Sequence, residues 1–472
     1  MNVLQEAYDL NTFKKRGKLL IDQIGKTHEL REKRPVIPNC QPEEQYQYWK
    51  NSFSQQSDPL ELFEDVINRS ILYQHPNYMG HQTAIPAMSG VLASLVVDYL
   101  NNAMGVYEMG IVGNAMERVV AEHLCGKFAL GDHAGGFFTS GGTLGTLTAI
   151  MTAKTHFLNN NNKESENLCI ITSEQAHYCV ERAALTMGLG RDGVIKIAVD
   201  DEYKMDIEQL KEQYDRITSE GKKVFCVIGS APSTSTGAYD DLQSIGNFCE
   251  QNNIWFHVDG AHGAGVIFSS KYNYLVKGIE KADSIVMDFH KMMLTPSLCT
   301  AVLLKDKQYS YDTFRQKADY LWQIEDNDWS QGGKRTFETT KSMYILKVFT
   351  LFKEFGDTIF EAYINNQYDL ARDFAASILR KDTFELACIP HSNIVCFRYI
   401  DCENANQFNT LLRQEIIEDG SFYLVQTTLD NKVYLRTTFM NSETTVSHTD
   451  KLIHFLEEKA EYLKANNSSS KI

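Results

Sequence analysis

Two apolar strand patterns, each ending in polar residues, constrain the fold of this 472-residue chain more than any other feature. The first runs from Ile254 through Trp-Phe-His-Val to Asp259, and the second runs from Ile285 through Val-Met into Asp288-Phe-His-Lys291. Continuous apolar strands of this kind are typical of a parallel sheet that is covered on both faces. Because ligands bind beyond the carboxyl ends of such strands, we expect the polar residues to line one site.

The pairing of Asp259 with Lys291 indicates a pyridine-aldehyde cofactor. A lysine amine forms a Schiff base with the aldehyde, and a carboxylate keeps the ring nitrogen protonated so that the ring accepts electrons. Taken singly, a strand-end aspartate is more often a cap or a turn residue, and a lysine after a strand is more often solvated. The His-Val-Asp and His-Lys pairs together favour the cofactor site.

Strand and helix patterns alternate through residues 130–305, which predicts an α/β fold with a doubly wound, mostly parallel sheet. A chain of 53.7 kDa is long enough for two or three domains. We expect an N-terminal helical arm at 1–64, a large cofactor-binding domain at 65–316, and a covering loop with a small α+β domain at 317–472.

Charge and composition exclude several classes of function. The net charge of −15 argues against nucleic acid and anionic membrane surfaces as partners. No apolar run approaches the ~20 residues that span a bilayer, and the N-terminus lacks the order of a secretory signal. Ten cysteines without a C-x-x-C pair predict reduced thiols in a cytoplasmic protein.

The motifs HVDGAHGA and DFHK resemble those of the group II pyridoxal-phosphate-dependent amino-acid decarboxylases, whose glutamate, aromatic and diaminobutyrate members carry HVDAA and a His-Lys pair. The resemblance extends from about residue 60 to about residue 440, with further motifs in matching order. It implies a fold-type I large domain with a small C-terminal domain and pyridoxal 5′-phosphate as cofactor. It also implies an amino-acid substrate and a homodimer with its active site at the subunit interface.

A glycine-rich stretch, Gly135–Gly145, precedes a helical pattern. Small residues let the backbone approach an anion, and the unpaired N–H groups of a helix start supply donors. The stretch matches the family's T-S-G-G-[ST] motif, which implies that Gly142 and Thr143 contact the cofactor phosphate. The family usually continues with Glu-Ala, whereas this chain has Leu144 and Gly145.

The resemblance implies several further cofactor contacts. His177 would stack on the cofactor ring, although a helix-capping histidine is the ordinary alternative. A turn that resembles T-x-x-T-G-A leaves the position of its cofactor hydrogen bond open among three hydroxyls. The full set implied in this way comprises His177, Ser233, Thr234, Ser235, Ala261, Asp288 and His290.

Three residues are expected at the substrate. Tyr78 and His81 belong to a segment that resembles the family's HP-x-[FY] motif at the substrate mouth, where a simple turn is the alternative. Lys341 matches an arginine that binds a substrate carboxylate in glutamate-specific members. A lysine keeps the charge but loses the bidentate fork, and a solvated helix lysine is an equal alternative.

Residues 318–333 resemble the mobile loop that covers the site, in which many members place a proton-donating tyrosine. This chain has no tyrosine between Leu321 and Met343; Tyr320 precedes this stretch and Trp329 lies within it. A relative without that phenol can divert its carbanion to oxygen and release an aldehyde. Otherwise another donor, such as His81 or a residue of a partner subunit, is required.

The sequence therefore predicts decarboxylation of an L-amino acid to its amine and carbon dioxide, with Lys291, His177 and Asp259 as the catalytic residues. Decarboxylation coupled to oxidative deamination is the nearest alternative. A metal-dependent hydrolase using His257, Asp259 and His262 is disfavoured, because a tight turn would have to bring the third ligand to the other two. An inactive relative that only binds a partner is disfavoured by the intact Lys291 and Asp259. We expect no resident metal, and the substrate side chain stays open.

Overall fold

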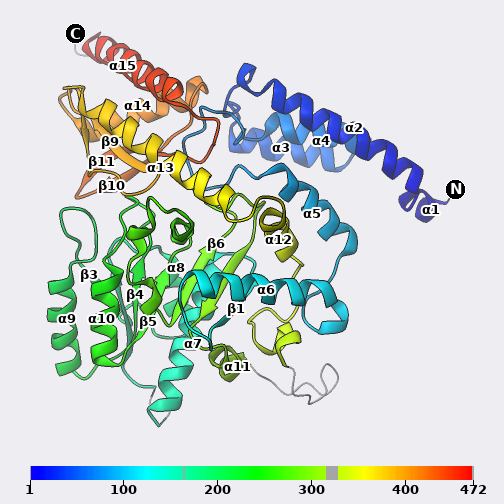
Figure 1. The fold of residues 1–472 in the computed structure, drawn as a ribbon. Coiled ribbons are helices and arrows are strands. Elements are labelled where there is room, and N and C mark those ends of the chain that lie inside the picture. Colours follow the sequence, from blue (N-terminus) through cyan, green and yellow to red (C-terminus); the bar gives the residue numbers. More distant parts are fainter. Residues whose placement is uncertain (1, 163–164, 315–327, 470–472) are drawn as a thin grey trace. The chain divides into compact units, whose positions relative to one another are not determined.

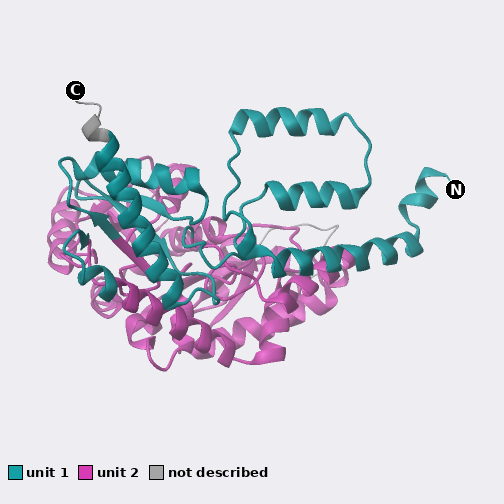
Figure 2. Cartoon of the chain, turned by 90° about the horizontal axis from the view of Figure 1, so that it is seen from above, with its two compact units in different colours: residues 1–81, 376–385, 397–472 teal, residues 82–375, 386–396 magenta. Residues whose placement is uncertain are grey.

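The computed structural model describes residues 2–162, 165–314 and 328–469, and its described residues form two compact units. Unit 1 comprises residues 1–81, 376–385 and 397–472, and unit 2 comprises residues 82–375 and 386–396 (Figure 2). This division differs from the predicted domains, because the N-terminal arm and the C-terminal lobe fall in one unit. It also extends the large unit well beyond residue 316.

A seven-stranded sheet forms the centre of unit 2, in the order β1-β7-β6-β5-β4-β2-β3 (Figure 1). Its strands are β1 Gly135–Thr139, β2 Leu168–Ser173, β3 Val194–Ile197, β4 Lys223–Ser230, β5 Trp255–Asp259, β6 Ser284–Asp288 and β7 Thr300–Leu304. Only β7 is antiparallel to its neighbours. Every residue of β2, β5, β6 and β7 is buried, so both faces of these strands are covered, as the apolar runs predicted. The predicted fold class is confirmed.

Two helices of unit 2 precede β1, and α-helices alternate with the strands from β1 to β5. The α-helices that lie wholly in unit 2 are α5 Met88–Leu100, α6 Ile111–Lys127, α7 Gly142–Asn160, α8 Cys179–Thr186, α9 Ile207–Ser219, α10 Leu242–Asn252, α11 Gln308–Phe314 and α12 Ile345–Phe355. Local signals set their limits: the Asp241 side chain caps α10 by accepting the N–H of Ser244, and left-handed Asn253 ends it. Apolar residues of α7 and α8 pack with β2 and β4 in one core cluster.

The N-terminal arm and the C-terminal lobe share a core in unit 1. The elements that lie wholly in unit 1 are α1 Val3–Ala7, α2 Leu10–Glu29, α3 Pro42–Phe53, α4 Pro59–Arg69, α14 Ala405–Asp419, α15 Val446–Ser469, β10 Val425–Leu429 and β11 Lys432–Thr438. Three further elements have residues in both units: α13 Thr358–Leu379, β8 Phe384–Leu386 and β9 Ile394–Tyr399. Val36 packs with Tyr78, Tyr423 and Val425, and its N–H donates to the carbonyl of Gly420 at 2.8 Å. Within the described ranges, no helix has the length and apolarity needed to cross a membrane.

Candidate active site

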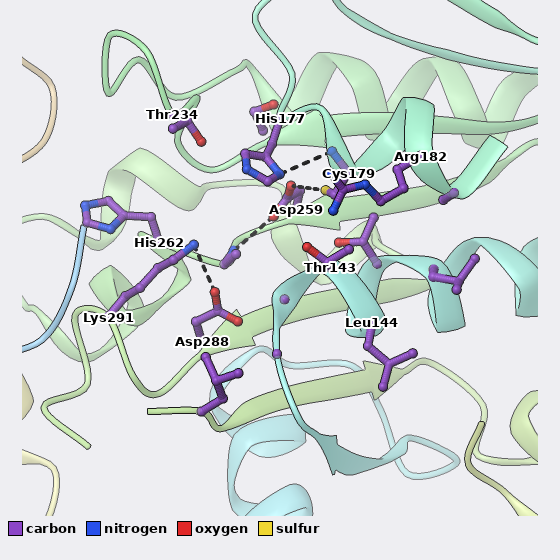
Figure 3. Close-up of a pocket in the computed structure, with 18 of the residues that line it drawn as sticks. Thr143, Leu144, His177, Cys179, Arg182, Thr234, Asp259, His262, Asp288 and Lys291 are labelled. Atoms are coloured by element: carbon purple, nitrogen blue, oxygen red, sulfur yellow. Dashed lines mark hydrogen bonds and ion pairs between the residues drawn. The ribbon is translucent and has the colours of Figure 1, made fainter. Parts of the chain in front are cut away.

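One cavity of about 430 Å³ lies in unit 2, beyond the carboxyl ends of β4, β5 and β6 and beside the first turns of α7 and α8 (Figure 3). This volume falls within the range of small-ligand sites. The wall includes Ser140, Gly141, Gly142, Thr143, His177, Cys179, Arg182, Ser233, Thr234, Asp259, Ala261, His262, Asp288, His290 and Lys291. The cavity therefore collects residues from strand ends that are far apart in the sequence.

Asp259 ends β5 and points its carboxylate into this cavity (Figure 3). Its Oδ1 accepts the N–H of Ala261 at 3.2 Å, and the thiol of Cys179 lies 3.9 Å from its Oδ2. The backbone turn thus fixes Oδ1, and Oδ2 lies beside a weak sulfur donor. An oriented carboxylate of this kind can bind a cationic N–H group of a ligand.

Lys291 follows β6 and forms an ion pair with Asp288, with 2.9 Å between Nζ and Oδ2. Burial alone would lower the pKa of Lys291, but the adjacent carboxylate outweighs it and raises that pKa above its ordinary value. Burial likewise tends to raise the pKa of Asp288, yet Lys291 and His290 lower it overall. The Lys291 side chain remains 22% exposed, so its amine is accessible from the cavity.

The turn between β1 and α7 forms an anion cradle. Gly141 precedes the helix with a φ of +154°, a conformation that side chains rarely adopt. A Cβ on Gly142 would approach the oxygens of Asp288 to 2.8 Å, so the absence of a side chain there keeps the helix start open. The first N–H groups of α7, a 19-residue helix, favour a negatively charged ligand group.

Two histidines complete the polar wall. His177 lies at the start of α8, where its Nδ1 accepts the N–H of Cys179 at 3.3 Å. Burial lowers the pKa of His177, which favours a neutral, flat ring. The Nδ1 of His290 lies 3.1 Å from the N–H of Cys299 and 3.0 Å from its carbonyl oxygen, and these contacts fix the imidazole beside Asp288.

This donor set fits pyridoxal phosphate. The group needs an anion cradle for its phosphate, an amine for its aldehyde and a carboxylate for its ring nitrogen. The cavity supplies them as the open glycine turn before α7, Lys291 after β6 and Asp259 at the end of β5. Parallel strands that end at the same edge of the sheet bring all three together.

Comparisons with known proteins agree with this site. Residues 42–400 match the model of the pyridoxal-dependent decarboxylase conserved domain. An aromatic-L-amino-acid decarboxylase of Bacillus atrophaeus is 30% identical over 420 residues, which cover 86% of each protein. An L-2,4-diaminobutyrate decarboxylase of Acinetobacter baumannii is 26% identical over 89% of this chain and 86% of its own length. The glutamate decarboxylase domain of a Vibrio parahaemolyticus diaminobutyrate protein superposes with a TM-score of 0.81 at 26% identity, covering 93% of this chain and 95% of that chain.

The chain belongs to the pyridoxal-dependent decarboxylase family. It is an enzyme that uses pyridoxal 5′-phosphate to decarboxylate an L-amino acid, and the predicted family, cofactor and activity are confirmed.

The remaining predicted cofactor contacts divide into two groups. Ser233, Thr234 and Ala261 lie in the cavity wall, as predicted for a cofactor-binding turn. Ser235 does not: its hydroxyl donates to the side chain of Gln175. Of the three hydroxyl residues that the sequence left open, Ser233 and Thr234 are thus the two that line the cavity. The Ser233 hydroxyl is also hydrogen-bonded to the Thr236 hydroxyl at 2.8 Å.

Of the three residues predicted at the substrate, two belong to unit 1 and one belongs to unit 2. Tyr78 and His81 belong to unit 1, where both contact Tyr423: the two phenol rings stack, and His81 Nε2 lies 3.0 Å from the Tyr423 hydroxyl. Lys341 is in unit 2 but not in the cavity wall. Its Nζ donates to Glu117 Oε2 at 2.7 Å and to the carbonyl of Phe138 at 2.8 Å, and a buried carboxylate thus takes the place of a substrate carboxylate.

The cavity wall also contains polar residues that were not singled out as cofactor contacts from the sequence, among them Cys179, Arg182 and His262. Cys179 and Arg182 face the cavity from α8, and their spacing of three after the His177 turn was an available helical signal. His262 was considered only as a metal ligand. Its Nε2 lies 2.8 Å from the side-chain oxygen of Asn393, while His257 Nδ1 pairs with the Ser284 hydroxyl.

The hydrolase alternative is not supported by these contacts, in which one ring nitrogen of His257 and one of His262 pair with Ser284 and Asn393. Within the part of the chain that the structure describes, no group of three or more histidine, cysteine or acidic side chains is arranged to hold a metal. Of the predicted covering loop at 318–333, residues 318–327, including Tyr320, lie outside the described residues. Trp329 is described, and the guanidinium of Arg118 lies 4.8 Å from the centre of its ring.

Proposed function

We propose that Lys291 anchors pyridoxal phosphate and that Asp259 holds the proton on the ring nitrogen during amino-acid decarboxylation. The observation that carries this proposal is that the Lys291 amine and the Asp259 carboxylate face one cavity, with the open glycine turn at its edge. When bound, pyridoxal phosphate supplies a ring that accepts the electron pair released as the substrate carboxylate leaves.

The other residues of the cavity wall would orient the cofactor and border it. The first N–H groups of α7, from Gly142 and Thr143, would hold the phosphate together with His290. His177, kept neutral by burial, would lie flat against the ring and limit its tilt. Ser233 and Thr234 would border the cofactor from the turn after β4. Because the cofactor would be held at both ends, the substrate bond that breaks can be oriented relative to the ring, and this orientation supplies much of the rate.

Replacement of the anchor tests this proposal. In Lys291→Ala, we expect loss of the cofactor absorbance band and of carbon dioxide release, in a chain that still folds with a moderately lower free energy of unfolding. The matched control is Lys271→Ala, because Lys271 is an exposed lysine that pairs with Asp369. Retained turnover in Lys291→Ala, or a borohydride-reduced cofactor adduct on another lysine, would refute the assignment.

The product is proposed to be the amine. Coupled oxidative deamination is the second candidate, because residues 322–342 contain no tyrosine that could donate a proton. A screen of aromatic, acidic and diamino L-amino acids should measure amine, aldehyde, peroxide and carbon dioxide together. Amine equal to carbon dioxide supports simple decarboxylation, whereas aldehyde and peroxide in equal amounts would establish the second candidate.

A homodimer is the proposed assembly, and an apolar helix face supports it. Leu92, Leu95, Val96 and Tyr99 of α5 are all exposed and recur at helical spacing. Contiguous exposed apolar side chains of this kind mark protein contacts. Leu92→Glu should lower the mass measured by light scattering, while Leu379→Glu on α13 should not. A cytoplasmic location is proposed because all ten cysteines are free.

A further inference from the structure

Asp288 is a buried carboxylate in the cavity wall for which the proposed reaction gives no task. It is 2% exposed, its Oδ1 accepts the Thr300 hydroxyl at 2.5 Å, and its Oδ2 lies 2.9 Å from Lys291 Nζ. The Nε2 of His290 is 3.7 Å from the same Oδ2. A Cβ on Gly142 would meet both oxygens at 2.8–2.9 Å, so the carboxylate lies against the first turn of α7.

This position creates a conflict of charge. The first turn of α7 is the proposed place of the cofactor phosphate, and an ionised carboxylate beside a phosphate is repelled. Lys291 must also lose its proton before its nitrogen can attack a carbonyl carbon. If the proton left the site altogether, Asp288 would remain ionised and buried without its cation, which is costly.

The surrounding groups leave few other destinations for that proton. The titratable groups around the pair are His290 beside it, Asp259 at the end of β5, and His177 and Cys179 at the start of α8. Asp259 is the proposed partner of the ring nitrogen, and burial lowers the pKa of His177. Asp288 is in direct contact with the lysine amine, which the structure shows for none of the others.

We infer that Asp288 accepts the proton of Lys291 when the cofactor is captured. An N–H bond of the ammonium breaks, its electron pair stays on Nζ, and an O–H bond forms at Asp288 Oδ2. The neutral acid then lies beside the phosphate without repulsion, and Thr300 and His290 keep it in place. Asp288 is thus a positioning residue that acts through Lys291, and the inference rests on the proposed role of that lysine.

Difference infrared spectroscopy tests the step on the wild-type chain. Adding pyridoxal phosphate to the cofactor-free protein should produce the carbonyl stretch of a protonated carboxylic acid. The band should be absent in Asp288→Asn and retained in Asp259→Asn. Absence of the band in the wild type, or its loss in Asp259→Asn alone, would overturn the inference.

The pH dependence of capture provides a second readout. Asp288→Asn removes the carboxylate that contacts the Lys291 amine, so the midpoint pH of covalent capture should fall by about one to three units. Thr300→Val, which keeps the carboxylate, should shift it much less. If Asp288→Asn bound the cofactor phosphate more tightly but left the midpoint pH of capture unchanged, Asp288 would only repel the phosphate. That result would overturn the inference. Locating the borohydride-reduced adduct separates the two proposals: an adduct away from Lys291 refutes the anchor, and an adduct on Lys291 without the acid band refutes only the task of Asp288.

Discussion

Two of the lysine–carboxylate pairs that the structure describes in unit 2 have a buried carboxylate and similar ion-pair distances, but their surroundings differ. Lys291 and Asp288 are 2.9 Å apart on the cavity wall, whereas Lys341 and Glu117 are 2.7 Å apart with both side chains 1% exposed. Arg335 also donates to Glu117, at 3.2 Å. The second pair is surrounded by protein, and the first faces a space that a ligand can enter.

The electrostatics of the two lysines differ in sign. Burial lowers the pKa of Lys341 below its ordinary value, since Glu117 offsets the burial only in part and Arg335 opposes the charge. For Lys291 the carboxylate outweighs the burial, and the pKa is raised. Ion pairs of similar length can thus accompany pKa shifts of opposite direction, depending on the other groups around the lysine.

The largest expected difference between the pairs is in stability. Lys341→Met leaves Glu117 buried beside one arginine and should lower the free energy of unfolding by about 3–5 kcal/mol. Lys291→Met should lower it less, by about 1–3 kcal/mol, because the Lys291 side chain is 22% exposed and Thr300 still donates to Asp288. Urea unfolding of the two variants measures both values. Equal losses would remove the distinction between a structural and a reactive pair.

A smaller effect is expected at the third partner of Asp288. Thr300→Val removes the donor to Oδ1 and should cost about 1–3 kcal/mol of unfolding free energy, the usual value for a hydrogen bond to a charged group. Thr313→Val, on α11, is a matched control, because Thr313 donates only to a backbone carbonyl of its own helix. If both variants lose the same amount, the Asp288 contact has no special weight.

The smallest effect is a difference in pH slope, expected to stay below about 1 kcal/mol per pH unit for each lysine. The lowered pKa of Lys341 means that the unfolded chain binds more protons, so its contribution to stability rises as the pH approaches 10.5 from below. The raised pKa of Lys291 gives a contribution that is complete below 10.5 and is lost above it. Unfolding of Lys341→Met and Lys291→Met from pH 8 to 11 should therefore deviate from the wild type in opposite directions. Deviations of the same sign would contradict the assigned directions.

The strand ends of the cavity could be predicted from the sequence because they depend on local pattern. The apolar runs before Asp259 and Lys291 predict strands, and parallel strands necessarily bring their carboxyl ends to one edge. The glycine turn before α7 was predictable for the same reason, since small residues before a helical pattern define an open helix start. The roles assigned to these residues remain proposals.

The partners of buried side chains could not be predicted in this way. Lys341 and Glu117 are 224 positions apart, and no periodicity links them, so a substrate contact and a solvated lysine were the alternatives weighed for Lys341. The grouping of the chain into two compact units depends on contacts of the same kind. The contact of Val36 with the backbone of Gly420 unites the two ends of the chain, and no local pattern of either segment indicates it.

The position of β7 between β1 and β6 determines how far apart the cradle and the anchor can be. Thr300 at the start of β7 pairs with Thr139 at the end of β1 on one side and with Asp288 at the end of β6 on the other. Two strand spacings of about 4.8 Å therefore separate the last residues of β1 and β6, which precede the glycine turn and Lys291. A shift of β7 by one residue would turn the Thr300 hydroxyl to the opposite face and leave Asp288 Oδ1 without its donor. The place of β7 between β1 and β6 and its register with both strands therefore limit the size of the molecule that can reach from the glycine turn to Lys291.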